Sequence, residues 1–251
     1  MGKELKTLDA QATLPVAMAQ AFANDAGRGM EEADKDSYAI PFLAILQGLS
    51  PQIESVEGAR PGMICNTITN ELFKEVLVIP CYYQRRFLRW ASRENGGGLK
   101  GEYSAVDVES GKVQGIQRDA MGRLLIDGDE LKDTRSHFVL FQSANGTWSP
   151  ALLSLSSTQI KKSKRWMSLI QGLEIALPDG STVNPPSFSH IYKLTTAKEE
   201  NSKGSWYGVN FALHGVVQDA QLYAKARAFH ASVAAGDVQA QRPENDEPAP
   251  F

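Results

Sequence analysis

Cysteine and histidine are scarce in this chain, which holds two cysteines and four histidines among 251 residues. Cys65 and Cys81 are far apart in the sequence, and no CxxC or HxxxH spacing occurs. Zinc sites built from thiolates and imidazoles use closely spaced ligands, so we expect no metal site and no cofactor. The two thiols are expected to be reduced and to lie in or near the core.

Long apolar runs and catalytic signatures are also missing. The first residues, "MGKELKTLDAQATL", carry acids where a signal peptide needs an apolar run, and no stretch approaches the ~20 residues of a membrane span. No GxxxxGK[ST], GxGxxG or GxSxG motif is present, and the acids at 127–130 have the spacing of a solvated turn. We therefore predict a cytoplasmic protein that is not an enzyme.

Charge divides the chain into three parts. Residues 1–36 hold four Lys/Arg against seven Asp/Glu, and residues 237–251 hold one against four, so each end carries −3. The 21 basic and 18 acidic residues of 37–236 give the middle +3. This pattern predicts a mobile acidic N-terminal arm, a single domain and a disordered acidic tail.

The sequence pattern in the middle of the chain is typical of a mainly β protein. Short apolar or alternating segments predict strands, and Pro80 predicts either a bulge or a sheet edge near the end of one of them. The Asn-Gly pair at 145–146 predicts a hairpin. The predicted strands lie at 62–70, 75–83, 103–108, 113–117, 123–126, 137–143, 150–156, 188–196 and 206–213, with a polar loop over 197–205. Helices are predicted near 14–23, over 158–177 with Ser156 or Ser157 as the cap, and over 218–235. The expected fold class is mainly β or α+β, an OB-fold-like β-barrel with insertions, an internal helix and a C-terminal helix.

The stretch "CYYQRRFLRWASR" (81–93) interleaves aromatic rings with arginines. Alternate residues of a strand share a face, so either face would combine rings with guanidinium groups. Unpaired bases stack on rings while cations follow the phosphates, so this pattern favours single-stranded nucleic acid. The alternative is a strand with one core face and one solvated face. The candidate contacts are Tyr82, Tyr83, Arg85, Arg86, Phe87, Arg89, Trp90, Arg93 and Lys100.

Two further patches combine cations with rings. Lys161, Lys162, Lys164, Arg165 and Trp166 lie near the start of a predicted helix, where cations oppose the helix dipole unless an anion binds there. Lys193, Trp206 and Tyr207 fall on the last predicted hairpin, and both rings fit core positions equally well.

The tail ends in "NDEPAPF". Asp246, Glu247, Pro250 and Phe251 resemble the acidic tip of bacterial and phage single-stranded DNA-binding proteins, which ends in Pro-Phe or Phe. The resemblance implies that the terminal ring enters a pocket of a replication or recombination protein. It also implies an oligonucleotide-binding barrel in the body. This sequence departs from the bacterial form in having only two adjacent acids and an interposed "PAP".

Together these features predict a non-catalytic, phage-type single-stranded DNA-binding protein acting in replication or recombination. If it is phage-encoded, it would work in the cytoplasm of the bacterial host. The domain over 37–236 would bind DNA and the tail would recruit partners. Homo-oligomerisation is left open. Two alternatives are a phage adaptor or inhibitor that binds a host replication or repair enzyme, and a structural component of the virion.

Overall fold

The computed structural model describes residues 15–33, 37, 39–92, 96–202, 204–238 and 240. The chain divides into two compact units, Met1–Ala39 and Ile40–Phe251. The first unit contains the helix α1 (Val16–Asn24), none of whose residues is buried. All the core clusters of the described residues belong to the second unit.

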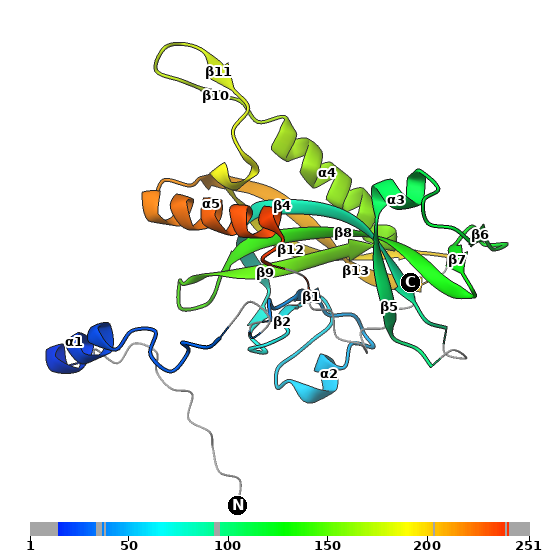
Figure 1. Ribbon diagram of the computed structural model, residues 1–251, viewed down its shortest axis with the longest axis horizontal. Helices are drawn as coiled ribbons and strands as arrows, with labels where there is room; N and C mark the ends of the chain where they lie inside the picture. Colours follow the sequence, from blue (N-terminus) through cyan, green and yellow to red (C-terminus); the bar gives the residue numbers. More distant parts are fainter. Residues whose placement is uncertain are drawn as a thin grey trace, which may run out of the picture. The chain divides into compact units, whose positions relative to one another are not determined.

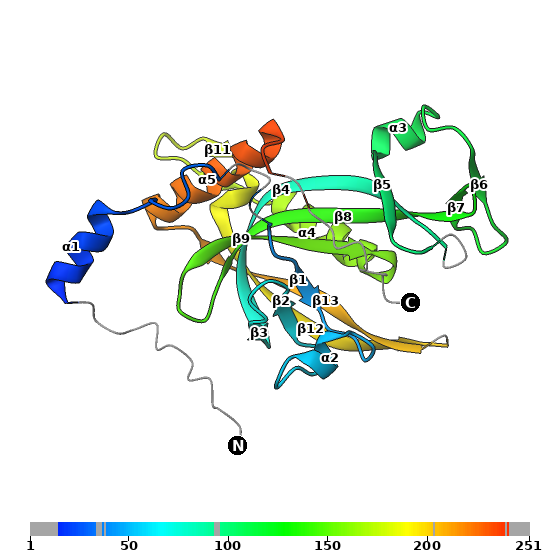
Figure 2. The same cartoon turned by 60° about the horizontal axis from the view of Figure 1, so that its bottom comes forward.

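The second unit is built on a curled antiparallel sheet of half-barrel form (Figures 1 and 2). Its two central strands, β4 (Glu75–Trp90) and β8 (Asp129–Gln142), pair along most of their length. Because β12 pairs with the first half of β4 and β5 with the second, the sheet changes neighbours along this strand. The other strands of the sheet are β5 (Leu99–Ser104), β6 (Ile116–Arg118), β7 (Leu124–Ile126), β9 (Trp148–Ser156), β12 (His190–Asn201) and β13 (Gly204–Val216). The mainly β, α+β class predicted from the sequence is confirmed.

Both faces of the sheet are buried at its centre. Val139 and Phe138 are neighbours in β8 and therefore point to opposite faces. Val139 shares a cluster with Trp166 of helix α4 (Ile160–Gln171), whereas Phe138 shares one with Phe229 of helix α5 (Ala220–Ala235). Helices α4 and α5 thus cover opposite faces of the sheet.

Smaller elements complete the unit. A three-stranded sheet adds Leu43, Ile64 and Phe73 to the cluster under α4. A third cluster, around Phe87 and Leu131, lies where β4 ends beside the start of β8. The three-stranded sheet consists of β1 (Leu43–Ile45), β2 (Ile64–Asn66) and β3 (Leu72–Phe73). The other small elements are the helices α2 (Gln52–Ser55) and α3 (Ala105–Glu109), the 3-10 helices η3 (Ser157–Gln159) and η4 (Ser187–Ser189), and the hairpin of β10 (Ile175–Ala176) and β11 (Thr182–Val183).

Several local predictions are confirmed. The β4–β8 register shifts between Pro80 and Tyr82, as expected where proline cannot donate a ladder hydrogen bond. The Asn-Gly pair lies in the turn between β8 and β9. Both cysteines are free and buried, and burial raises the pKa of Cys81 to about 12.

Other local predictions are wrong. Part of the predicted strand 103–108 is the helix α3, because the hydroxyl of Ser104 accepts a hydrogen bond from the amide of Asp107 and caps it. The polar stretch 197–205 is not a loop, since most of it pairs across β12 and β13. Helix α4 starts at Ile160, without a side-chain cap from Ser156 or Ser157.

Candidate nucleic-acid interface

The aromatic residues in the second half of β4, Phe87 and Trp90, are buried from solvent. Phe87 is 4% exposed, because it packs in a core cluster with Ile126 and Leu131, and Trp90 is 8% exposed. The guanidinium of Arg85 also lies over the Phe87 ring, 5.2 Å from its centroid. The prediction that Phe87 and Trp90 stack bases is therefore wrong for this conformation.

The two tyrosines of β4 are half-buried and face opposite sides of the sheet. Tyr82 packs beneath α5, with its ring centroid 5.4 Å from that of His230. The ring of Tyr83 packs on His137 at 5.1 Å, and its hydroxyl accepts a hydrogen bond from Arg135 at 2.9 Å. Both rings thus have protein partners on at least one side.

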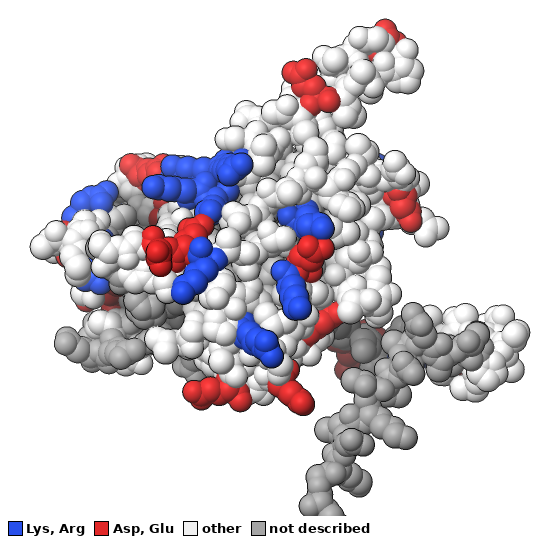
Figure 3. Space-filling model, turned by 180° about the vertical axis from the view of Figure 1, so that it is seen from behind, with Lys and Arg blue, Asp and Glu red and all other residues white. Residues whose placement is uncertain are grey.

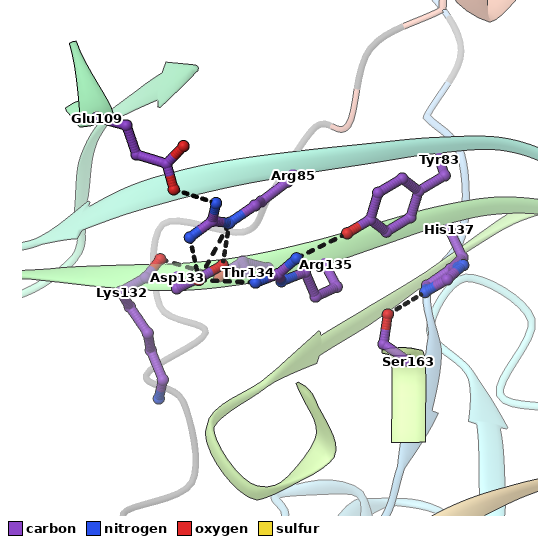
Figure 4. A network of polar contacts seen from close by, with 9 residues as sticks. All are labelled: Tyr83, Arg85, Glu109, Lys132, Asp133, Thr134, Arg135, His137 and Ser163. Carbon is purple, nitrogen blue, oxygen red and sulfur yellow. Dashed lines mark hydrogen bonds and ion pairs between the residues drawn. The ribbon is translucent and has the colours of Figure 1, made fainter. Parts of the chain in front are cut away.

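Carboxylates neutralise Arg85, which lies at the centre of a polar network (Figure 4). Its guanidinium forms ion pairs with Asp133 at 2.9 Å and with Glu109. The hydrogen bond to Asp133 is the main cause that raises the pKa of Arg85. Asp133 is shared with Arg135 at 3.0 Å, so this network links β4, β8 and α3.

The remaining described cations of the β4 stretch are paired as well. Arg86 lies 3.2 Å from Glu102, and Arg89 lies 2.7 Å from Asp129 and 3.1 Å from Asp127. Lys100 approaches the same Asp129 carboxylate at 3.4 Å. Two of the acids that the sequence placed on a turn, Asp127 and Asp129, are thus the partners of Arg89. The signal that could have revealed this was the cluster of acids at the start of the segment that becomes β8.

Helix α4 is fixed to the sheet by a buried polar contact beside stacked rings. His137 Nε2 lies 2.7 Å from Ser163 Oγ, and burial lowers the pKa of His137 to about 3. Because both residues are 1% exposed, this pair holds the helix and is not accessible to a substrate. Trp166 is 0% exposed and stacks on Phe211, so the prediction that Trp166 contacts DNA is wrong.

The opposite side of α4 carries exposed cations. Lys161, Lys164 and Arg165, here called the basic face of α4, are exposed and form no ion pair with any residue that the structure describes. Figure 3 shows several Lys and Arg side chains on one face of the molecule, with Asp and Glu side chains among them. Lys162 differs, because it pairs with Glu199 and reaches Asn210 Oδ1 at 3.3 Å.

The start of α4 lacks the groups that normally stabilise a helix N-terminus. Its first turn contains no acid, and its N-cap residue, Gln159, makes no capping hydrogen bond. The side chain of Gln159 instead accepts a hydrogen bond from the amide of Val209 in β13 at 3.0 Å. Cations at this end oppose the helix dipole, whereas a bound anion would be stabilised by both the cations and the dipole.

The last hairpin brings one ring close to α4. Trp206 of β13 is half-buried and lies directly opposite Glu199 of β12, the partner of Lys162. Tyr207 packs over Gly62, whose φ is +88° and where a Cβ would lie 2.5 Å from the ring. Lys193 is paired with Glu75 at 2.9 Å. Of this predicted cluster, Trp206 is thus the residue that joins the neighbourhood of α4.

Five predicted site residues lie outside the described part of the chain: Arg93, Asp246, Glu247, Pro250 and Phe251. The tail contact with a replication or recombination protein stays a prediction. Within the described residues, no group of three or more His, Cys, Asp or Glu side chains could hold a metal ion. No helix in the same part of the chain is both long and apolar enough to cross a membrane.

Fold and site together define an α+β protein with a curled antiparallel sheet and a helix, α4, whose three exposed cations form no ion pair with the residues that the structure describes. The chain matches the family described as Pam3 phage gp34-like protein over residues 9–239 and belongs to that family. It is therefore a phage-type protein. No curated protein matches it, and no solved structure does.

Proposed function

We propose that this phage-type protein binds single-stranded DNA without catalysing a reaction, and that the basic face of α4 is its phosphate-binding surface. One observation carries the proposal: Lys161, Lys164 and Arg165 are exposed without carboxylate partners, whereas the described cations of β4 are paired. DNA replication or recombination is the setting that such binding would serve.

The spacing of the three cations suits a phosphate backbone. Residues three and four apart lie on the same side of a helix, so Lys161, Lys164 and Arg165 form a single face. Binding to phosphates would release counterions from the DNA, which supplies a large share of the free energy at low salt. A phosphate near the start of α4 would also meet the favourable end of the helix dipole.

Preference for a single strand is supported by Trp206. Its ring is half-buried, and its cross-strand neighbour Glu199 is tied to α4 through Lys162. A base that stacks on a ring contributes about 1–3 kcal/mol, but a base inside a duplex has no free face to offer. Phosphates on α4 and one unpaired base on Trp206 would use the same side of the unit.

The test is fluorescence anisotropy of a labelled dT oligomer with the full-length chain at low salt. The variant K161A/K164A/R165A removes the basic face of α4. Its matched control, R60A/K74A/R227A, removes three exposed cations that lie elsewhere in the second unit. Both variants change the net charge by the same amount, so a general electrostatic effect would weaken both equally.

We expect the α4 variant to bind the oligomer at least about tenfold more weakly, while the control stays close to wild type. Wild type should also prefer the single strand to a duplex of the same length. Absence of binding by wild type, or equal loss in the two variants, would overturn the proposal.

A further inference from the structure

The surface formed by α4 and the hairpin after it carries opposite charges at its two ends. The basic face of α4 lies near the start of the helix, at 161–165. The β10–β11 arm, defined here as residues 172–184, contains Glu174 and Asp179 and no lysine or arginine. In Figure 3 the projecting arm shows only acidic charge, whereas the body shows Lys and Arg together with some Asp and Glu.

An exposed leucine lies between the two charged ends. Leu169 is 42% exposed and follows Arg165 by one helical turn, so Lys161, Arg165 and Leu169 form one stripe along α4. The arm carries two further exposed apolar residues, Leu177 and Val183, which are 37% and 39% exposed. Along the chain, the exposed cations at the start of α4 are thus followed by the apolar Leu169 and then by the arm, which carries acids and apolar residues.

The acids of the arm are held out in solvent. The arm pairs only Ile175 with Val183 and Ala176 with Thr182, and a hairpin of this size gains little stability by itself. At its turn, Asp179 accepts hydrogen bonds from the Ser181 hydroxyl at 2.6 Å and the Ser181 amide at 3.0 Å. These hydrogen bonds lower the pKa of Asp179, so its carboxylate is ionised at neutral pH.

We propose that this surface binds a second copy of the chain in an antiparallel, two-fold arrangement. With two copies aligned head to tail along α4, the basic face of each meets the acidic arm of the other. Leu169 then meets its symmetry mate near the axis. A charge pattern that runs from positive to negative is self-complementary under a two-fold rotation, which is the symmetry of most homodimers.

Such a dimer would regulate the proposed DNA-binding site, because it covers the same three cations that phosphates would contact. Single-stranded DNA and the second copy would compete for the basic face of α4. The regulatory consequence rests on the proposed function, but the dimer contact itself does not.

Sedimentation velocity of the full-length chain at low salt, without DNA, tests the contact. Wild type should form a dimer that dissociates as salt rises, since exposed ion pairs are screened. The variants K161E/R165E and E174K/D179K should each lose self-association by about tenfold or more, because like charges would then face each other. Mixing the two variants should restore a heterodimer, since each then supplies the charge that the other lacks.

A chain with all four substitutions should dimerise again on its own. A monomeric wild type under these conditions, or variants that dimerise as well as wild type, would overturn the inference.

DNA binding is measured separately with E174K/D179K, which keeps every cation of α4. If wild type dimerises as expected but neither chain binds the dT oligomer, the proposed function fails while the dimer stands. If both bind DNA but wild type is monomeric, the dimer fails alone.

Discussion

The indole of Trp166 stacks on the ring of Phe211, with centroids 4.0 Å apart and planes at 10°. This contact joins α4 to β13 and buries the tryptophan completely. Trp166→Ala should destabilise the fold by about 3–5 kcal/mol, because it leaves a large cavity under α4. Urea unfolding followed by circular dichroism measures the loss. A cost below 1 kcal/mol would show that α4 does not depend on this ring.

Trp206 should behave differently, because it is half-buried and near the proposed DNA-binding surface. Trp206→Ala should weaken binding of a dT oligomer by about 1–3 kcal/mol, the range for one stacked base. Trp148 is the matched control, since it is also half-buried but packs on the α5 side of the sheet. If Trp148→Ala weakens binding as much as Trp206→Ala, stacking on Trp206 is not the cause.

His137 makes stability depend on pH. The pKa of His137 in the folded chain, about 3, lies below the ordinary value of 6.5. At a pH between these two values, His137 is protonated in the unfolded chain but neutral in the folded chain. The contribution of His137 to stability is therefore lost as pH falls below 6.5. Lowering pH from 6.5 to 5 should cost wild type about 1.5 kcal/mol more than it costs His137→Phe, which has no titrating ring. Equal pH dependence in the two proteins would contradict the buried, neutral state of the ring.

Substitutions at two glycines of one loop should distinguish the cost of backbone strain from the cost of a steric clash. Gly58 and Gly62 both have φ near +80° to +90°, but only at Gly62 would a Cβ meet the ring of Tyr207. Gly58→Ala should cost about 1 kcal/mol through backbone strain alone. Gly62→Ala should cost clearly more, because Tyr207 must also move. Equal costs in thermal unfolding would show that Tyr207 is free to leave this position.

Several of the strands were predictable, because their signals are local. The apolar run of β4, the bulge at Pro80 and the hairpin at Asn145 each depend on neighbours in sequence. The burial of Phe87 was not predictable, since it depends on distant residues: Ile126 and Leu131 pack on its ring, and Asp133 neutralises the neighbouring Arg85. The basic patch at 161–166 was predictable because its cations lie close together in the sequence. The burial of Trp166 within that patch was not, since it depends on stacking against Phe211 of β13. The pairing of Lys162 with Glu199 requires tertiary structure and left no signal in the sequence.

The salt dependence of DNA binding tests the central claim most directly. For single strands the logarithm of the binding constant falls with the logarithm of salt concentration by about 0.7 for each phosphate neutralised. Titrations of a dT oligomer across a series of salt concentrations should therefore give a slope for K161A/K164A/R165A that is about 2 units shallower than wild type. The R60A/K74A/R227A control should keep the wild-type slope. Identical slopes for wild type and the α4 variant would show that phosphates do not bind to the basic face of α4.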